Sequence, residues 1–313
     1  MKAVRVHAWG EPPRIEELPE PLAAPGRTLV RMQAATVGHI DRTVWSGAFL
    51  RHPPLPYVPG VEAAGVVLSS ERFAPGQRVW MRGGGLGIAR DGTWRECVDA
   101  PDEALGELPD GVSFALGSAF FSPCTSAWIA LHEVGQLRPG ERVLVSGASG
   151  AVGSIAVQLA REAGAEARAV VYDAAQARRL APGIEAVEAA DLQAEADLLL
   201  DMVGGSALPQ ALRGVKPGGR AVLVGYAGGP EARLDLPELL QRDVALLPLN
   251  ILRREASARA AAPRLLQQIA QGRLQLAVRE FPLAQAAEAL QWIATRGHAG
   301  RAVLTVPASA VGG

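Results

Sequence analysis

The spacing of apolar residues changes near residue 112, and this change divides the chain into two kinds of pattern. Before it, short apolar and β-branched runs, such as 28–34 and 60–68, are separated by turns rich in proline and glycine. Such runs predict the β-strands of a small barrel or sandwich. Further strands are expected at 4–7, 77–81 and 94–99, and a Gly-rich loop is expected at 82–92.

Beyond residue 112, helical stretches alternate with strands. Helical periodicity covers 116–135, and strands are expected at 143–145, 168–172, 196–202, 220–225 and 244–251, with helices at 153–163, 175–180, 208–213 and 236–242. Alternation at this spacing predicts a parallel sheet with helices on both faces. From about residue 256 the pattern is mixed, and a closing strand at 301–306 is expected to return to the first domain.

Residues 142–164 carry the most informative local pattern of the chain. An apolar strand runs into a turn of small residues that include Ala148, Gly150 and Gly153, and a helix with an apolar face follows directly. Small residues let the backbone approach a ligand closely, and the N–H groups at the start of the helix can hold a pyrophosphate. Ala148 replaces the first glycine of the dinucleotide pattern, but the strand and helix around it favour a dinucleotide site over a ligand-free turn.

Composition and charge narrow the classes of function. The 313 residues suffice for two domains, and a net charge of −1 gives no electrostatic footprint for nucleic acid or an anionic membrane. No secretory leader or unbroken apolar span of membrane length is visible. Cys97 and Cys124 are too few for a disulfide framework or a cysteine-rich metal site. We therefore expect a cytoplasmic protein that binds neither nucleic acid nor a membrane.

Several short blocks follow one another in a specific order: PYVPGVEAAGVV at 56–67, GTWRECV at 92–98, LPDGVS at 108–113, LRPGER at 137–142, DMVGG at 201–205 and RGHAGR at 296–301. Together they resemble the medium-chain dehydrogenase/reductase superfamily, in its zinc-free quinone-oxidoreductase-like branch. The resemblance implies an α/β protein with a GroES-like partial β-barrel catalytic domain and a doubly wound parallel-sheet Rossmann domain. We expect residues 1–117 and 256–313 to form the GroES-like domain, and residues 118–255 to form the Rossmann dinucleotide-binding domain.

The resemblance also indicates where this chain departs from its relatives. The zinc-dependent members carry Cys where this chain has Gly38 and His where it has Val61, so we expect no zinc. His39 together with Glu62 or Asp41 could ligate a metal, which is the less favoured alternative. Without a metal, the resemblance implies a small-molecule substrate, with hydride transfer from the nicotinamide to the β-carbon of an activated alkene or to a quinone.

An oxygen that gains charge in this reaction needs a hydrogen-bond donor. The resemblance implies an Asn at the position of Gly38, so the usual polar group is missing. His39 and Tyr57 are the candidate catalytic donors, although each could instead have a structural role. Asp41 is expected to have a structural role. Trp45 is expected either to line the substrate pocket or to belong to the core.

Cofactor contacts are expected on the carboxyl edge of the Rossmann sheet and in the helix before it. The candidates are Ser126, Ala148, Ser149, Gly150, Ala151, Val152, Gly153, Tyr172, Asp173, Arg178, Val203, Gly225, Tyr226 and Asn250. Asp173 follows Gly153 by about 20 residues, where an acid would favour NADH. The family alignment puts that acid at Val171 instead, and Arg178 and Arg179 could meet a 2′-phosphate or form a solvated helix face. We favour NADPH and leave NADH open.

Two functions are consistent with these residues. The first is a zinc-independent, NADPH-dependent reductase of quinones or α,β-unsaturated carbonyls. The second, motivated by Gly38 and Trp45, is a dinucleotide-binding protein with little turnover that serves as a sensor or structural protein. A zinc-dependent alcohol dehydrogenase is a third, which metal analysis would test. The resemblance implies a homodimer formed through the last Rossmann strand, although Pro248 removes a backbone donor there.

Overall fold

The computed structural model describes residues 1–50, 52–295 and 299–306, and they form two compact units. The barrel unit comprises Met1–Phe121, Leu266–Arg273 and Ala277–Gly313, and the sheet unit comprises Ser122–Leu265 and Leu274–Leu276. Residues 296–298, which open the last of the resemblance blocks, lie outside the described residues. Each unit is described by itself below.

The barrel unit is built on a seven-stranded sheet with the order β14-β15-β3-β4-β5-β7, and β6 also pairs with β3. The strands are β3 (Arg27–Val37), β4 (Glu62–Ser69), β5 (Arg78–Arg82), β6 (Cys97–Pro101), β7 (Leu105–Glu107), β14 (Val278–Pro282) and β15 (Arg301–Thr305). Strand β15 pairs antiparallel with β3, with Ala302 opposite Val37. The prediction that the closing strand returns to the first domain is therefore confirmed.

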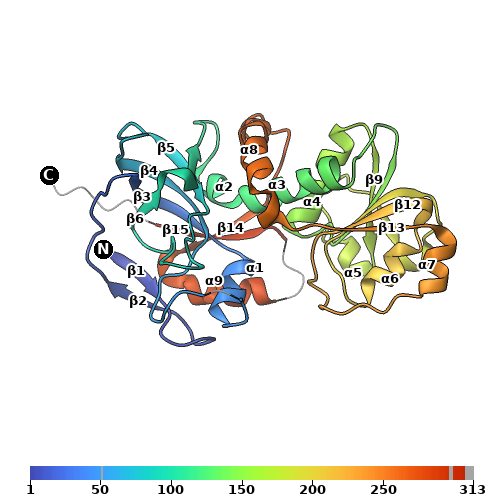
Figure 1. The fold of residues 1–313 in the computed structure, drawn as a ribbon, viewed down its shortest axis with the longest axis horizontal. Helices are drawn as coiled ribbons and strands as arrows, with labels where there is room; N and C mark the ends of the chain where they lie inside the picture. The colour runs from blue at the N-terminus through green and yellow to red at the C-terminus, as the bar shows by residue number, and fades with distance from the viewer. Residues whose placement is uncertain (51, 296–298, 307–313) are drawn as a thin grey trace. The chain divides into compact units, whose positions relative to one another are not determined.

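The remaining elements of the barrel unit cover this sheet or flank it (Figure 1). They are the hairpin β1 (Lys2–Arg5) and β2 (Arg14–Glu17), the helices α1 (His39–Trp45), α2 (Phe114–Ala119) and α9 (Ala286–Ala294), and the short η1 (Asp102–Ala104) and η5 (Leu283–Gln285). The expected strand at 4–7 ends two residues early, and β2 was not expected because prolines surround it. The core contains Met32, Met81 and Trp94, with apolar residues of α9 packed on the same cluster.

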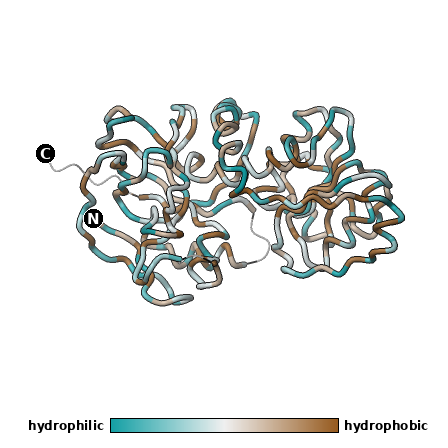
Figure 2. The backbone as a smooth tube through the Cα atoms, viewed as in Figure 1, coloured by the Kyte–Doolittle hydropathy of each residue, from teal (hydrophilic) through white to brown (hydrophobic). Residues whose placement is uncertain are grey.

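The sheet unit contains a six-stranded parallel sheet with the order β10-β9-β8-β11-β12-β13. Its strands are β8 (Arg142–Ser146), β9 (Glu166–Val171), β10 (Ala186–Glu188), β11 (Ala196–Asp201), β12 (Val215–Leu223) and β13 (Ala245–Pro248). Central strands of a sheet buried on both faces are continuously apolar, and they are the brown segments of the tube in this unit (Figure 2). This order and the alternation with helices are those of a Rossmann fold, as the sequence predicted.

The helices of this unit follow the predicted alternation. They are α3 (Phe121–Ile129), α4 (Ala151–Glu162), α5 (Ala174–Ala177), α6 (Ala207–Leu212), α7 (Leu236–Arg242) and the long α8 (Glu255–Ala270), whose last turns belong to the barrel unit, with short η3 (Ala189–Asp191) and η4 (Ile251–Arg254). Leu144 of β8 packs into a cluster with Leu208 and Leu212 of α6, whereas α4 packs on β8 and β9. Among the described residues, no helix is both long and apolar enough to cross a bilayer.

Two expected elements are shorter than the sequence pattern indicated. The helical stretch at 116–135 is divided into α2, α3 and a π-helical turn, η2 (Ala130–Val134). Pro123, which lacks an N–H, lies in the first turn of α3, where helices tolerate proline. The strand expected at 244–251 ends at Pro248, where Leu249 still donates its N–H to the Leu223 carbonyl oxygen at 2.9 Å, and Asn250 then caps η4.

Candidate functional site

The phosphate-binding turn lies between β8 and α4 and depends on close backbone packing. Gly147 has a positive φ of 67°, which a residue with a side chain rarely adopts. A Cβ at Gly153 would lie 2.8 Å from Ala148 Cα and would also overlap the Gly147 carbonyl oxygen. Gly150 is the N-cap of α4, and no side chain of the described residues caps this helix. The first-turn N–H groups and the helix dipole can therefore be satisfied by an anion such as a diphosphate.

The register of the parallel strands brings the predicted cofactor residues to one edge of the sheet. Ser146 is opposite Asp201, Asp201 is opposite Leu223, and Leu223 is opposite Pro248. The segments that follow these strands therefore begin at the same carboxyl edge, where open α/β sheets bind ligands. They contain Ala148, Ser149, Gly150, Ala151, Val152, Gly153, Val203, Gly225, Tyr226 and Asn250, and Tyr172, Asp173 and Arg178 follow β9. Ser126 is half-buried in α3, which precedes β8 in the chain.

Asp201 organises the turn after β11 and was not among the predicted site residues. Its carboxylate is buried and accepts hydrogen bonds from the Ser146 hydroxyl, from Val203 N (3.3 Å) and from Gly204 N (2.8 Å). The Ser146 hydroxyl in turn accepts the N–H of Met202 at 3.1 Å. This network joins the turn after β11 to the end of β8, directly before the phosphate turn. An acid that ends an apolar strand, as in Leu-Leu-Leu-Asp, is the sequence signal that could have revealed it.

In the segment after β9, the acid Asp173 caps a helix. Asp173 is exposed and is the N-cap of α5, where Oδ1 accepts the Gln176 N–H at 2.7 Å. The Tyr172 hydroxyl donates to the carbonyl oxygen of Ala207 at 3.1 Å, and burial together with the charge of Asp201 raises its pKa. Arg178 is exposed at the end of α5. Contacts of these residues with a nucleotide remain predictions.

The other candidates on the carboxyl edge differ in exposure. Tyr226 is 71% exposed, and Asn250 Oδ1 accepts the N–H groups of Leu252 and Arg253 as the cap of η4. A Cβ on Gly225 would lie 2.8 Å from the Met202 carbonyl oxygen, so a side chain there would disturb the neighbouring turn. Gly225 thus keeps the ends of β11 and β12 close together.

In the barrel unit, Asp41 ties the start of α1 to the start of β4. Its Oδ2 accepts the Gly38 N–H at 2.8 Å, and its Oδ1 accepts the Val61 N–H at 3.0 Å. The side chain is 1% exposed, and burial raises its pKa to about 7. The charge of Glu62 adds to this rise, while the two N–H donors and Arg301 oppose it. Asp41 thus has the structural role that the sequence favoured.

Glu62 is equally buried, and two arginines neutralise it. Its Oε2 lies 2.7 Å from Arg301 Nη2, and its Oε1 lies 3.5 Å from Arg82 Nη1. Both oxygens of Asp41 and both of Glu62 therefore already face N–H donors. Carboxylates engaged in this way do not fit the ligand set of a catalytic zinc ion. Within the described part of the chain, no group of three or more His, Cys, Asp and Glu side chains is placed to hold a metal.

Tyr57 combines deep burial with an unsatisfied hydroxyl. It is 1% exposed and packs with Val6 and Val44, and its ring centroid lies 5.6 Å from that of Trp9. No partner for the hydroxyl exists among the residues that the structure describes. Burial, and then the charge of Asp41, raise its pKa, so the hydroxyl stays protonated at neutral pH. A buried hydroxyl without a partner is unfavourable, and a catalytic role and a bound water molecule are two of the explanations known for such groups.

The remaining barrel candidates lie nearer the surface. His39 is the exposed first residue of α1, and its carbonyl oxygen accepts the Thr43 hydroxyl at 2.8 Å. Trp45 is half-buried against the core clusters, and its Nε1 donates to the Glu11 carbonyl oxygen at 2.7 Å. A catalytic role for His39 remains a prediction.

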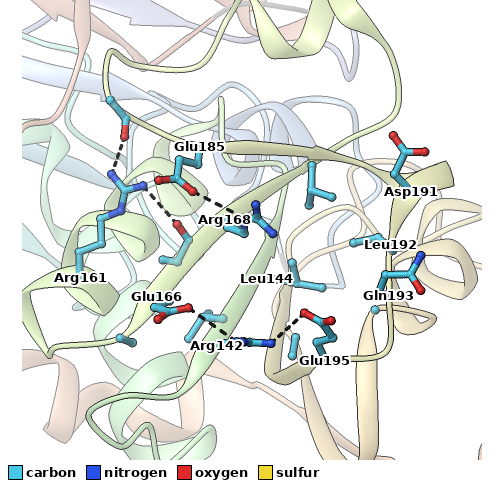
Figure 3. Close-up of a pocket in the computed structure, with 17 residues that line it drawn as sticks. Arg142, Leu144, Arg161, Glu166, Arg168, Glu185, Asp191, Leu192, Gln193 and Glu195 are labelled. Carbon is cyan, nitrogen blue, oxygen red and sulfur yellow. Dashed lines mark hydrogen bonds and ion pairs between the residues drawn. The ribbon is translucent and has the colours of Figure 1, made fainter.

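A cavity of about 590 Å³ lies at the opposite, amino edge of the parallel sheet (Figure 3). Five of its charged side chains pair with one another: Arg142 lies 2.8 Å from Glu195 and 3.6 Å from Glu166, and Arg168 lies 3.6 Å from Glu185. The ligand-binding edge of such a sheet is the carboxyl one, so we do not assign the nucleotide to this cavity.

Two family models match the chain. The alcohol dehydrogenase GroES-like domain matches residues 24–110, and the zinc-binding dehydrogenase family matches residues 164–304. The quinone oxidoreductase of Lama guanicoe is 30% identical over 251 residues, which cover 74% of this chain and 74% of that protein. The human synaptic vesicle membrane protein VAT-1 homolog is 31% identical over 235 residues, which cover 68% of this chain and 58% of that protein.

A solved structure gives the same result. The quinone oxidoreductase of Thermus thermophilus, described with its NADPH complex, has a TM-score of 0.81 at 32% identity. The match covers 98% of this chain and 100% of that one. The partial barrel, the Rossmann sheet and these likenesses agree, and the chain therefore belongs to the medium-chain dehydrogenase/reductase superfamily, as an oxidoreductase of its quinone-oxidoreductase-like branch.

Proposed function

We propose that this oxidoreductase is a zinc-independent reductase that uses NADPH to reduce quinones or α,β-unsaturated carbonyl compounds. The observation that carries the proposal is the Tyr57 hydroxyl, which is buried, protonated and without a partner in the described residues. Such a hydroxyl can donate a hydrogen bond to a substrate oxygen that gains negative charge. Access to it requires a neighbouring side chain to move, because Tyr57 is enclosed in this structure.

The turn between β8 and α4 fits the diphosphate of the cofactor, because glycine packing and an uncapped helix leave backbone N–H groups for it. When bound, the reduced nicotinamide supplies the hydride. The protein binds and orients it through the turn residues and the loops of the carboxyl edge. His39 is retained as a second candidate donor at the substrate.

We favour NADPH because Asp173, the acid that could bond the adenosine ribose, already caps a helix. Asp173 caps α5 through Oδ1, and Arg178 and Arg179 follow it at the end of this short helix. An Asp that bonds the ribose hydroxyls would select NADH, whereas nearby arginines suit a 2′-phosphate. That the Thermus relative was described with NADPH supports the same preference.

The test is to mix the full-length protein with NADPH and a panel of quinones and enones and to follow the nicotinamide absorbance. Oxidation of NADPH by at least one class is expected, with NADH used less efficiently. Tight NADPH binding without oxidation by any substrate would instead favour a sensor or structural protein. Metal analysis of the active protein should find no stoichiometric zinc.

We also propose a homodimer. Strand β13 is the last strand in the order of the parallel sheet and pairs with β12 on one side. An edge strand presents unpaired backbone groups that can pair with another chain.

A further inference from the structure

A buried arginine of the barrel unit lacks an ionic partner. Arg95 lies directly before β6 and is only 7% exposed. Among the described residues, its guanidinium donates a single hydrogen bond, from Nε to the Gly92 carbonyl oxygen at 3.0 Å. It forms no ion pair with any described carboxylate. Arginine side chains are almost never fully buried unless they are paired, so Arg95 lacks the negative charge that its burial requires.

The two carboxylates whose charges act on Arg95 are engaged elsewhere. Asp91 Oδ1 accepts the Val58 N–H at 2.8 Å. Asp99 Oδ2 lies 2.5 Å from Arg27 Nε. Burial lowers the pKa of Arg95, and these two acids only oppose that effect from a distance. The guanidinium nevertheless stays charged, because arginine is not deprotonated in proteins.

A second arginine without an ion pair lies close by. Arg31 of β3 is opposite Cys97 of β6, and it is half-buried. Burial raises the pKa of the Cys97 thiol to about 11, and the exposed acid Glu20 adds to the rise. The charges of Arg95 and Arg31 both oppose this rise, so both guanidinium groups lie near the thiol. Arg31, like Arg95, pairs with no described carboxylate.

The donors that remain on Arg95 suit an oxyanion. A guanidinium carries several N–H groups in one plane, and within the described part of the chain only that of Nε has an acceptor. The two Nη atoms are not fully enclosed, because neither is among the buried polar atoms that lack a partner. Neighbouring N–H groups of a guanidinium match the two oxygens of a carboxylate or phosphate group. Since so little of Arg95 is exposed, only a small ion can reach them.

We propose that Arg95, together with Arg31, forms a binding site for a small oxyanion, which carries a phosphate or a carboxylate group. The oxyanion accepts hydrogen bonds from the Nη groups of Arg95 and is attracted by the charge of Arg31. It supplies the missing counter-charge and stabilises the folded barrel unit, because the unfolded chain offers no such site. The inference does not depend on the proposed reductase function, since it involves neither the nucleotide turn nor Tyr57.

A purely structural role for Arg95 makes a different prediction. Water would then hydrate the Nη groups, and Arg95 would serve only to hold the Gly92 carbonyl oxygen. Arg95→Gln would change the stability by the same amount whichever anion is present. A bound oxyanion instead makes the effect of Arg95→Gln depend on the anion and its concentration.

The first experiment measures thermal unfolding of wild type, Arg95→Gln, Arg31→Gln and Arg90→Gln. Sodium chloride is replaced by phosphate or by acetate at constant pH and ionic strength, and the better of the two shows which oxyanion is preferred. It should raise the Tm of wild type by about 3 °C and that of Arg31→Gln by about half as much, with no rise in Arg95→Gln beyond any effect at other sites. Arg90, an exposed arginine earlier in the same loop, is the control for lost charge, and Arg90→Gln should keep the full rise.

Phosphate that binds the turn between β8 and α4 affects all four proteins alike and cancels in their comparison. An undiminished rise in Arg95→Gln or in Arg31→Gln would overturn the site as proposed. So would a Tm of wild type that neither phosphate nor acetate raises.

The second experiment needs no variant. Crystals of the wild-type protein are soaked in tungstate, a strongly scattering oxyanion. Anomalous density is expected within hydrogen-bond distance of the Arg95 Nη groups. Water at Arg95 with tungstate bound only elsewhere would overturn the inference, even if density at the turn after β8 supported the diphosphate site of the proposed reductase.

Discussion

At the scale of single residues, the buried polar groups of the barrel unit differ in whether they have hydrogen-bond partners. Asp41 and Glu62 are fully engaged, by backbone N–H groups and by arginines respectively. Tyr57 is buried just as deeply but keeps a hydroxyl without a partner among the described residues. The Tyr57 hydroxyl thus lowers the free energy of unfolding. Such a loss of stability is expected at functional sites.

Tyr57→Phe should therefore stabilise the protein while reducing its activity. Removing a buried hydroxyl that lacks a partner should raise the free energy of unfolding by about 1 kcal/mol. Loss of the donor should lower kcat by about 10- to 100-fold. Urea unfolding and steady-state kinetics test both. Tyr172→Phe is the control, because its hydroxyl does have an acceptor, Ala207 O, and its loss should destabilise the protein by about 1 kcal/mol. Destabilisation by Tyr57→Phe would show that the hydroxyl has a partner after all.

Asp41 should give the stability a distinct pH dependence. The folded protein holds this proton with a pKa of about 7, against 3.8 as the ordinary value. The folded state thus binds more protons than the unfolded chain between these values, so this group makes the free energy of unfolding fall as pH rises from 3.8 to about 7, with no further change above.

The measurement is urea unfolding of wild type and Asp41→Asn at pH 5 and pH 8. Asparagine does not titrate, so the change in stability from pH 5 to pH 8 should be more negative in wild type than in the variant. Asn also offers one acceptor oxygen where Asp offers two, so the variant should lose about 1 to 3 kcal/mol at pH 5. Parallel pH profiles for both proteins would refute the shifted pKa.

At the scale of elements, the phosphate turn is a packing contact between a helix and the strand before it. Gly153 lets the first turn of α4 lie directly on the backbone of Gly147 and Ala148. Position 150, by contrast, has open space apart from the Gly147 carbonyl oxygen at 3.3 Å. The requirement for glycine is thus stronger at Gly153 than at Gly150.

Gly153→Ala should push α4 away from the turn. Overpacking of this kind costs about 1 to 3 kcal/mol, and the displaced N–H groups should weaken NADPH binding at least about 10-fold. Calorimetric titration with NADPH and thermal unfolding measure the two effects. Ser154→Ala, the next residue of the same helix, should change either quantity little, because among the described residues its hydroxyl donates only to the Ala151 carbonyl oxygen, at 3.1 Å. NADPH affinity that is unchanged by Gly153→Ala would place the diphosphate elsewhere.

The elements that sequence patterns predict well are those with local causes. The expected helix at 236–242 coincides with α7, which Asp235 caps, and the parallel alternation around β8 is observed. Errors arise where a tertiary partner decides. The single helical stretch at 116–135 is interrupted by a π-helical turn, whose end is held by Arg220, which donates to the Gly135 carbonyl oxygen. No periodicity in residues 116–135 can reveal an arginine on β12.

The candidate site shows the same division. The glycine turn could be read locally, because its residues are consecutive. The ion pair of Glu62 with Arg301 could not, because Arg301 arrives through strand pairing from the far end of the chain. The capping bond of Asp173 to Gln176 was also not read from the sequence, because it depends on where β9 ends, a position that sequence patterns define poorly. The predicted contact of Asp173 with a cofactor stays a prediction.

At the scale of the whole molecule, the exposed edge of β13 should determine the assembly state. We expect sedimentation at about twice the 32.7 kDa of one chain. Ala245→Lys, an exposed position on β13, should shift the protein toward the monomer, because lysine on an edge strand opposes pairing. Ala227→Lys, an exposed alanine outside β13, should leave the mass unchanged. A wild type that sediments as a single chain would contradict the dimer.

The central place of β15 in its sheet has a consequence for biosynthesis. This strand follows every other strand of its sheet along the chain, yet it lies between β14 and β3. A ribosome must therefore synthesise the chain through β15 before the barrel can close and Arg301 can reach Glu62. The Rossmann sheet, whose strands are all translated by residue 248, has no such delay. Nascent chains should thus be able to acquire the nucleotide fold before the catalytic barrel exists.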